Sequence, residues 1–158
     1  MSKKLLSIYL NDHLAGATVG LELARRARGA NEGTPLGDML AELEREIDED
    51  RDSLKALMSK LGVREDPLKV AAGWAAEKAG RLKLNGQLTG YSPLSRLVEL
   101  EGLYVGVTGK LSLWKNLEAT QGERIGGIDI AALSKRAESQ RRRLATARRK
   151  AAEEAIST

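Results

Sequence analysis

The sequence has no cysteine, no phenylalanine and a single histidine, His13, among its 158 residues. Without cysteine, disulfides, thiolate catalysis and cysteine-type zinc sites are excluded. One histidine and scattered serines give no catalytic triad, and neither a phosphate loop nor a dinucleotide fingerprint occurs, so no small-molecule substrate can be identified. Aromatic residues make up only 3% of the chain. A core built from Leu, Ile, Val and Ala therefore favours helix-on-helix packing.

Long apolar runs are also missing. No stretch approaches the roughly 20 apolar residues needed to cross a bilayer. The apolar stretch near the N-terminus is too short for a signal peptide and is interrupted by Asn11, Asp12 and His13. We therefore expect a soluble, unexported, cytoplasmic protein that has no membrane partner.

What the sequence does contain is helical periodicity. Between Gly37 and Leu61 the apolar residues recur at spacings of three, four and seven, the pattern of a helix that packs into a bundle. Thr34-Pro35, Asp66-Pro67 and Ser92-Pro93 are helix-start signals. The chain predicts one all-α domain, 1–158, with helices over about 3–28, 35–61, 67–84, 93–117 and 129–156.

The connections predict how the four long helices are arranged. Short loops join the first two and the last two, whereas about 30 residues containing the helix 67–84 and an Asn85-Gly86 break bridge the pairs. Short loops make antiparallel neighbours, and one long crossover is the connection of ferritin-like four-helix bundles.

Each long helix carries one polar residue in its predicted apolar stripe. Asp50 lies between Ile47 and Leu54, and Glu101 lies on the predicted face of the fourth helix. That face is predicted to contain Leu94, Leu97, Tyr104, Leu111 and Trp114. The predicted polar core layer is His13, Asp50, Glu101 and Gln140.

Unpaired ionised groups in a core cost several kcal/mol, so these residues must satisfy each other, bind water or hold a metal. The first interpretation is a structural polar layer centred on a histidine–carboxylate pair. The second is a divalent metal, zinc, manganese or iron, held by His13, Asp50 and Glu101.

Gly102, Gly106 and Gly109 form a small-residue groove on the fourth helix. Each costs a helix roughly 1 kcal/mol relative to alanine. Close helix–helix contact is the expected reason for them, and the groove or an outer apolar face is the expected surface of a homodimer.

Charge is unevenly distributed. Residues 38–52 contain eight acids against two bases, whereas residues 134–150 contain eight bases against one acid. Pairing between these two helices is the first interpretation. The alternative is non-specific nucleic-acid binding by the basic helix. The residues for that alternative are Arg141, Arg142, Arg143, Arg148 and Arg149.

The stretches YLNDHLAGATVGLELARR, LGDMLAELEREIDEDRDSLKALMSKLG and PLSRLVELEGLYVGVTGKLSLWKNL resemble ferritin-like proteins, above all small bacterial stress-associated bundles. That resemblance implies a di-iron or di-manganese site built from two Glu residues and two Glu-x-x-His pairs. No Glu-x-x-His occurs here, because Glu49 follows Glu46 and Arg141 follows Glu138 at the spacing of three.

The sequence therefore predicts a ferritin-like bundle without a functional di-metal site, which acts as a structural or interaction module and not as an enzyme. A reduced metal site acting in redox or stress chemistry is the alternative from the enzyme class. Nucleic-acid binding is the third.

Overall fold

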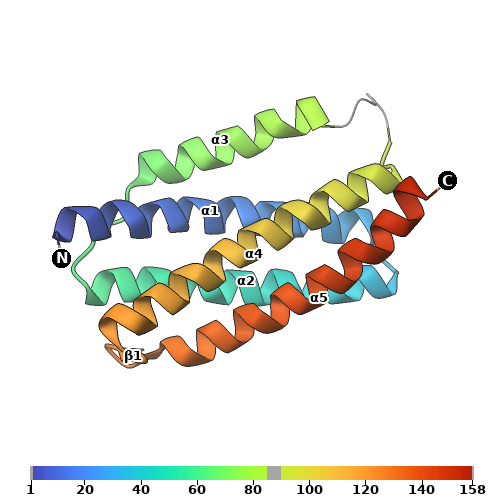
Figure 1. Ribbon diagram of the computed structural model, residues 1–158. Coiled ribbons are helices and arrows are strands. Elements are labelled where there is room, and N and C mark those ends of the chain that lie inside the picture. Colours follow the sequence, from blue (N-terminus) through green and yellow to red (C-terminus); the bar gives the residue numbers. More distant parts are fainter. Residues whose placement is uncertain (1, 85–89, 158) are drawn as a thin grey trace.

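The computed structural model describes residues 2–84 and 90–157 and shows an all-α fold, as the sequence predicts (Figure 1). The predicted Asn85-Gly86 break lies outside the described residues. The helices are α1 (Lys3–Ala30), α2 (Pro35–Lys60), α3 (Pro67–Leu84), α4 (Pro93–Gln121) and α5 (Ile130–Ile156), and two-residue strands β1 (Arg124–Ile125) and β2 (Ile128–Asp129) precede α5.

The predicted start signals all lie at helix N-termini. The side chain of Thr34 accepts a hydrogen bond from the Gly37 amide at 3.1 Å, and that of Ser92 accepts one from the Ser95 amide at 3.1 Å. Asp129 does the same for the Ala132 amide at 2.9 Å. These contacts satisfy backbone donors that have no partner within the helix.

The connection between α4 and α5 is shorter than predicted, because α4 continues to Gln121 and not only to about residue 117. The remaining residues form an antiparallel hairpin in which Arg124 pairs with Asp129 and Ile125 with Ile128. Its two turn residues, Gly126 and Gly127, have φ angles of 55° and 89°. Positive φ at both positions is what a type I′ hairpin turn requires, and glycine adopts it without steric cost.

The four long helices form two antiparallel pairs, α1 with α2 and α4 with α5, and α1 also packs against α4 (Figure 1). Helix α3 lies along α1 and carries the chain back to the other end of the bundle. Consequently α2 and α4 run in the same direction. Among the described residues, no helix combines the length and hydropathy that crossing a bilayer requires.

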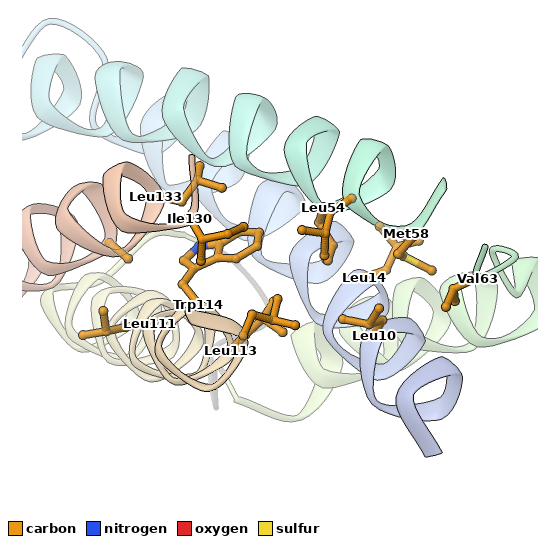
Figure 2. Close-up of a cluster of buried hydrophobic side chains, with 13 residues drawn as sticks. Leu10, Leu14, Leu54, Met58, Val63, Leu111, Leu113, Trp114, Ile130 and Leu133 are labelled. Atoms are coloured by element: carbon orange, nitrogen blue, oxygen red, sulfur yellow. The ribbon is translucent and has the colours of Figure 1, made fainter. Parts of the chain in front are cut away.

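The interior has two apolar clusters. The first, part of which Figure 2 shows, surrounds Trp114 and includes Leu10, Leu14, Leu54 and Ile130. The second lies farther along the bundle and consists of Leu21, Ala24, Ala27, Leu40, Leu43, Ile47, Leu97, Leu100, Leu103, Val107, Leu144 and Ala151. Along α2, Asp50 lies between Ile47 of the second cluster and Leu54 of the first, and Glu46 lies one turn before Asp50. Polar side chains therefore reach the middle of the bundle.

The buried face of α4 contains part of the predicted stripe. Leu97, Leu111 and Trp114 are buried as predicted, whereas Leu94 is 52% exposed and Glu101 is also exposed. Leu100, Leu103 and Val107 are buried in addition to the predicted residues, because α4 has more apolar residues than one face can hold. Packing against α1 and α5 selects among them.

Candidate functional site

Asp50 is the centre of the buried polar layer, with a side chain that is 1% exposed. Its Oδ2 accepts hydrogen bonds from Lys110 Nζ at 2.6 Å and from Gln140 Nε2 at 3.1 Å. Its Oδ1 accepts one from Arg136 Nε at 2.8 Å. Asp50 thus joins α2 to both α4 and α5.

Lys110 is the residue that the sequence analysis missed. Its ammonium also donates to Gln140 Oε1 at 2.5 Å. Burial lowers the pKa of Lys110, and the attraction of Asp50 opposes that effect. A signal was present in the sequence, because Lys110 interrupts the stripe of Leu103, Val107 and Trp114 as Asp50 interrupts that of α2.

The layer continues along α2 and α5. Glu46 Oε2 accepts hydrogen bonds from Gln140 Nε2 at 3.0 Å and from Arg143 at 2.5 Å. Arg136 also donates to Glu49 at 2.8 Å. The layer therefore holds three carboxylates and three cations, which balance in charge. They are Glu46, Glu49, Asp50, Lys110, Arg136 and Arg143.

These contacts settle how the acidic and basic helices relate. The basic helix turns Arg136 and Arg143 toward α2, so pairing within the chain is confirmed for these two residues. Arg148 lies over the Tyr104 ring at 5.1 Å. Of the remaining arginines predicted to bind nucleic acid, Arg142 and Arg149 are exposed, and Arg141 is partly buried.

The predicted metal ligands are not brought together. Asp50 is buried in the layer, Glu101 is exposed, and His13 lies on α1. In the part of the chain that the structure describes, no three His, Cys, Asp or Glu side chains gather closely enough to hold a metal ion. Within the predicted polar layer, the structure joins Asp50 and Gln140 directly. Lys110 is the side chain of α4 that meets them, in place of the predicted Glu101.

His13 is half-buried, with its ring edge-on to Tyr9 at a centroid distance of 4.7 Å. Burial lowers the pKa of His13 below its ordinary value of 6.5, and the negative charge of Asp12 opposes the shift. The imidazole is therefore neutral at pH 7. It lines a cavity beside the polar layer.

That cavity has a volume of about 240 Å³ and lies between α1, α2 and α4. Its wall is mainly apolar and includes Ile47, Leu54, Leu103, Val107 and Leu113. Asp50 and Lys110 also line it, so the cavity and the polar layer share a boundary. The glycines in its wall are Gly16, Gly20, Gly102, Gly106 and Gly109.

Most of these glycines do not serve close helix packing. A Cβ added at Gly16, Gly20, Gly106 or Gly109 would meet no atom within 4 Å. The predicted close contact is therefore wrong at Gly106 and Gly109. It holds only at Gly102, where a Cβ would lie 3.0 Å from Leu23 Cδ2. The missing side chains leave space instead.

Two residues of the cavity wall have hydrogen-bond donors without a partner. Trp114 is 1% exposed, and its Nε1 is buried with no hydrogen-bond partner among the described residues. Arg51 Nε is also buried and has no hydrogen-bond partner among the described residues, although the NH2 atom of Arg51 lies 3.2 Å from Asp48 Oδ1. Buried donors in native proteins nearly always have a partner, so both need an explanation.

A second polar cluster lies at the start of α4. Tyr91 donates to Glu99 at 2.9 Å and accepts from Asn31 at 3.0 Å. Arg26 and Arg96 complete the cluster, donating to Glu99 and to Asn31. Burial raises the pKa of Tyr91 to about 12, with the negative charge of Glu99 adding to the shift.

Comparisons of the chain with protein-family models, curated proteins and solved structures found no match. The ferritin-like resemblance thus stays a prediction.

Proposed function

We propose that this protein is a ferritin-like helical bundle without a di-metal site, with a structural or interaction role. The observation that carries the proposal is the position of Lys110, whose ammonium lies between Asp50 and Gln140 in the interior. The crossover formed by α3, with α2 and α4 running in the same direction, supports the ferritin-like arrangement.

The donor set of the polar layer does not fit a divalent metal. Metal ligands must offer free lone pairs, but Asp50 accepts hydrogen bonds on both carboxylate oxygens from Lys110, Arg136 and Gln140. A metal ion beside Asp50 would also meet the positive charges of Lys110 and Arg136. The lysine and the two arginines supply the positive charge that buried carboxylates require.

In this proposal the polar layer has a structural role. Hydrogen-bonded charges on α2, α4 and α5 favour one alignment of the three helices, because any sliding leaves a buried charge unpaired. A module of this kind acts through its surface. The predicted homodimer belongs to this proposal, and sedimentation analysis of the purified protein tests it.

Elemental analysis tests the central claim. Protein purified without chelator or affinity metal should contain far less than one equivalent of iron, manganese or zinc per chain. Its unfolding midpoint should not change with EDTA. Stoichiometric metal that is lost in His13→Ala would overturn the proposal and favour the enzyme alternative.

Polyanion binding is the second candidate function, favoured by the exposed Arg142, Arg149 and Lys150 on α5. If they contact phosphates, affinity for duplex DNA falls steeply with salt. The double variant Arg142→Gln/Arg149→Gln should then lower the log–log slope by about 0.9 per lost contact. Lys4→Gln, which removes an exposed charge from α1, is the matched control. An affinity for duplex DNA that does not change with salt concentration excludes this function.

A further inference from the structure

The cavity between α1, α2 and α4 is built by omission. Five glycines from two helices line it, and at four of them a methyl group would meet only open space. Glycine inside a helix costs roughly 1 kcal/mol relative to alanine. Gly106 and Gly109 therefore weaken α4 without the compensation of close packing, and what they provide is volume.

The unpaired donors of Trp114 and Arg51 indicate which kind of ligand the cavity can bind. Trp114 Nε1 and Arg51 Nε both carry a hydrogen that no described residue accepts. Leaving a buried donor unpaired costs about 1–3 kcal/mol. Two carboxylates line the wall. Asp50 is already occupied by Lys110, Arg136 and Gln140, and Asp12 is exposed and accepts a hydrogen bond from Lys69. Neither carboxylate serves the two donors. An acceptor from outside the chain can.

We propose that this cavity is a binding site for a small, mainly apolar molecule with one hydrogen-bond-accepting end, a carbonyl or a carboxylate. The apolar body packs against Ile47, Leu54, Leu103 and Val107. The accepting end pairs with a donor that has no partner among the described residues, the Trp114 indole or Arg51. This inference goes beyond the structural role proposed above, and the metal content of the protein does not bear on it.

The volume of the cavity and the chemistry of its wall narrow the class of ligand. An engineered apolar cavity of about 150 Å³ holds benzene, so about 240 Å³ accommodates a body of six to ten carbon atoms. Cationic molecules such as alkylammonium ions have no acceptor to offer the two open donors, and the charges of the wall do not compensate for that, because Arg51 and Lys110 are balanced by Asp12 and Asp50. Suitable probes are hexanoate and hexanamide, with hexylammonium as the molecule of similar shape that has no acceptor.

The indole N–H of Trp114 provides a direct readout by ¹⁵N NMR. The chain has two tryptophans, and the other, Trp74 on α3, is 48% exposed and outside the cavity wall. Trp74→Phe assigns the two indole signals. Hexanoate or hexanamide should shift the Trp114 signal downfield in a saturable way and leave the Trp74 signal in place. The tighter of the two probes distinguishes a carboxylate from a neutral carbonyl ligand.

Filling the cavity separates binding from folding. Gly106→Leu and Gly109→Leu place side chains in the open space and should weaken probe binding about tenfold or more while the helices remain folded. Gly29→Leu is the matched control, because Gly29 also lies in a helix with open space around it but does not line the cavity. It should leave binding unchanged.

Three results would overturn the proposal. One is the absence of a saturable Trp114 shift with hexanoate and hexanamide at millimolar concentration. The second is an equal shift with hexylammonium, which would remove the acceptor from the argument. The third is undiminished binding in folded Gly106→Leu and Gly109→Leu, which would place the probe elsewhere.

Discussion

The polar layer and the glycine-lined cavity share Asp50 and Lys110, yet they treat polar groups in opposite ways. In the layer each carboxylate meets a cation and Gln140 uses both ends of its amide. In the cavity wall, Trp114 and Arg51 keep buried donors without partners among the described residues. One region is closed by its own side chains, whereas the other is complete only with an external acceptor.

This difference separates structural polarity from polarity available for binding. A satisfied layer favours one alignment of helices but offers no lone pairs to a ligand. A cavity with open donors costs stability, and such a cost is typical of binding sites. Polar residues in a helical core therefore indicate function only when their hydrogen-bonding capacity is not used up within the chain.

Breaking the closed region should produce the largest effect. Asp50→Ala leaves Lys110 and Arg136 without their shared buried partner, so the free energy of unfolding should fall by about 3–5 kcal/mol in urea titrations. Asp48→Ala, which removes only a surface partner of Arg51, should cost less than about 1 kcal/mol. Equal losses in both variants would mean that the layer does not stabilise the bundle.

Replacing a glycine of the cavity wall by alanine should raise the free energy of unfolding, in contrast to Asp50→Ala. Gly109→Ala adds helix propensity without a clash, so stability should rise by about 1 kcal/mol. Gly37→Ala is the contrasting change, because its Cβ would lie 2.1 Å from the Asn31 carbonyl oxygen and the loop would have to move. Urea unfolding compares the two. A loss of stability at Gly109 would show that this glycine is needed for packing after all.

Acidification should lower the stability of the protein through His13, which lines the cavity. Its pKa is lowered in the folded state by burial, so the unfolded chain takes up the proton first as the pH falls below about 6.5. Stability from this group is then present above that pH and is lost on further acidification. The unfolding midpoint of His13→Gln should depend less on pH between 7 and 5 than that of the parent protein. Parallel pH profiles would contradict the burial of His13.

The smallest effect concerns the second closed cluster. Because the pKa of Tyr91 is raised to about 12, the folded state keeps a proton that the unfolded chain has lost. Stability from this group therefore falls as the pH rises from 10 through 12. The absorbance titration at 295 nm of the parent minus that of Tyr91→Phe should show one tyrosinate forming near pH 12. A midpoint near 10 would mean that Tyr91 is not held by Asn31 and Glu99.

The helices themselves followed from the sequence, because their signals are local. Thr34-Pro35 and Ser92-Pro93 lie at the starts of α2 and α4, and the stripe through Leu40, Leu54 and Leu57 is buried in α2. N-caps and apolar periodicity depend on residues within one or two turns. The pairing of the acidic with the basic helix also followed, since opposite charges attract whatever their exact register.

The site followed only in part. Asp50 and Gln140 could be recognised, because each interrupts an otherwise regular stripe. Glu101 was placed in the layer and Lys110 was missed, because α4 carries apolar residues on several faces and periodicity alone does not select the buried one. Partners on α1 and α5, far away in the sequence, make that selection.

The amino-acid sequence by itself determined the all-α class, the helix starts and the charge asymmetry, because each depends on neighbouring residues or on composition. Only the tertiary structure decided that Gly106 and Gly109 leave space instead of allowing close contact. It also decided that Lys110 is the residue of α4 in the polar layer. Both depend on distances between helices, which no single helix encodes.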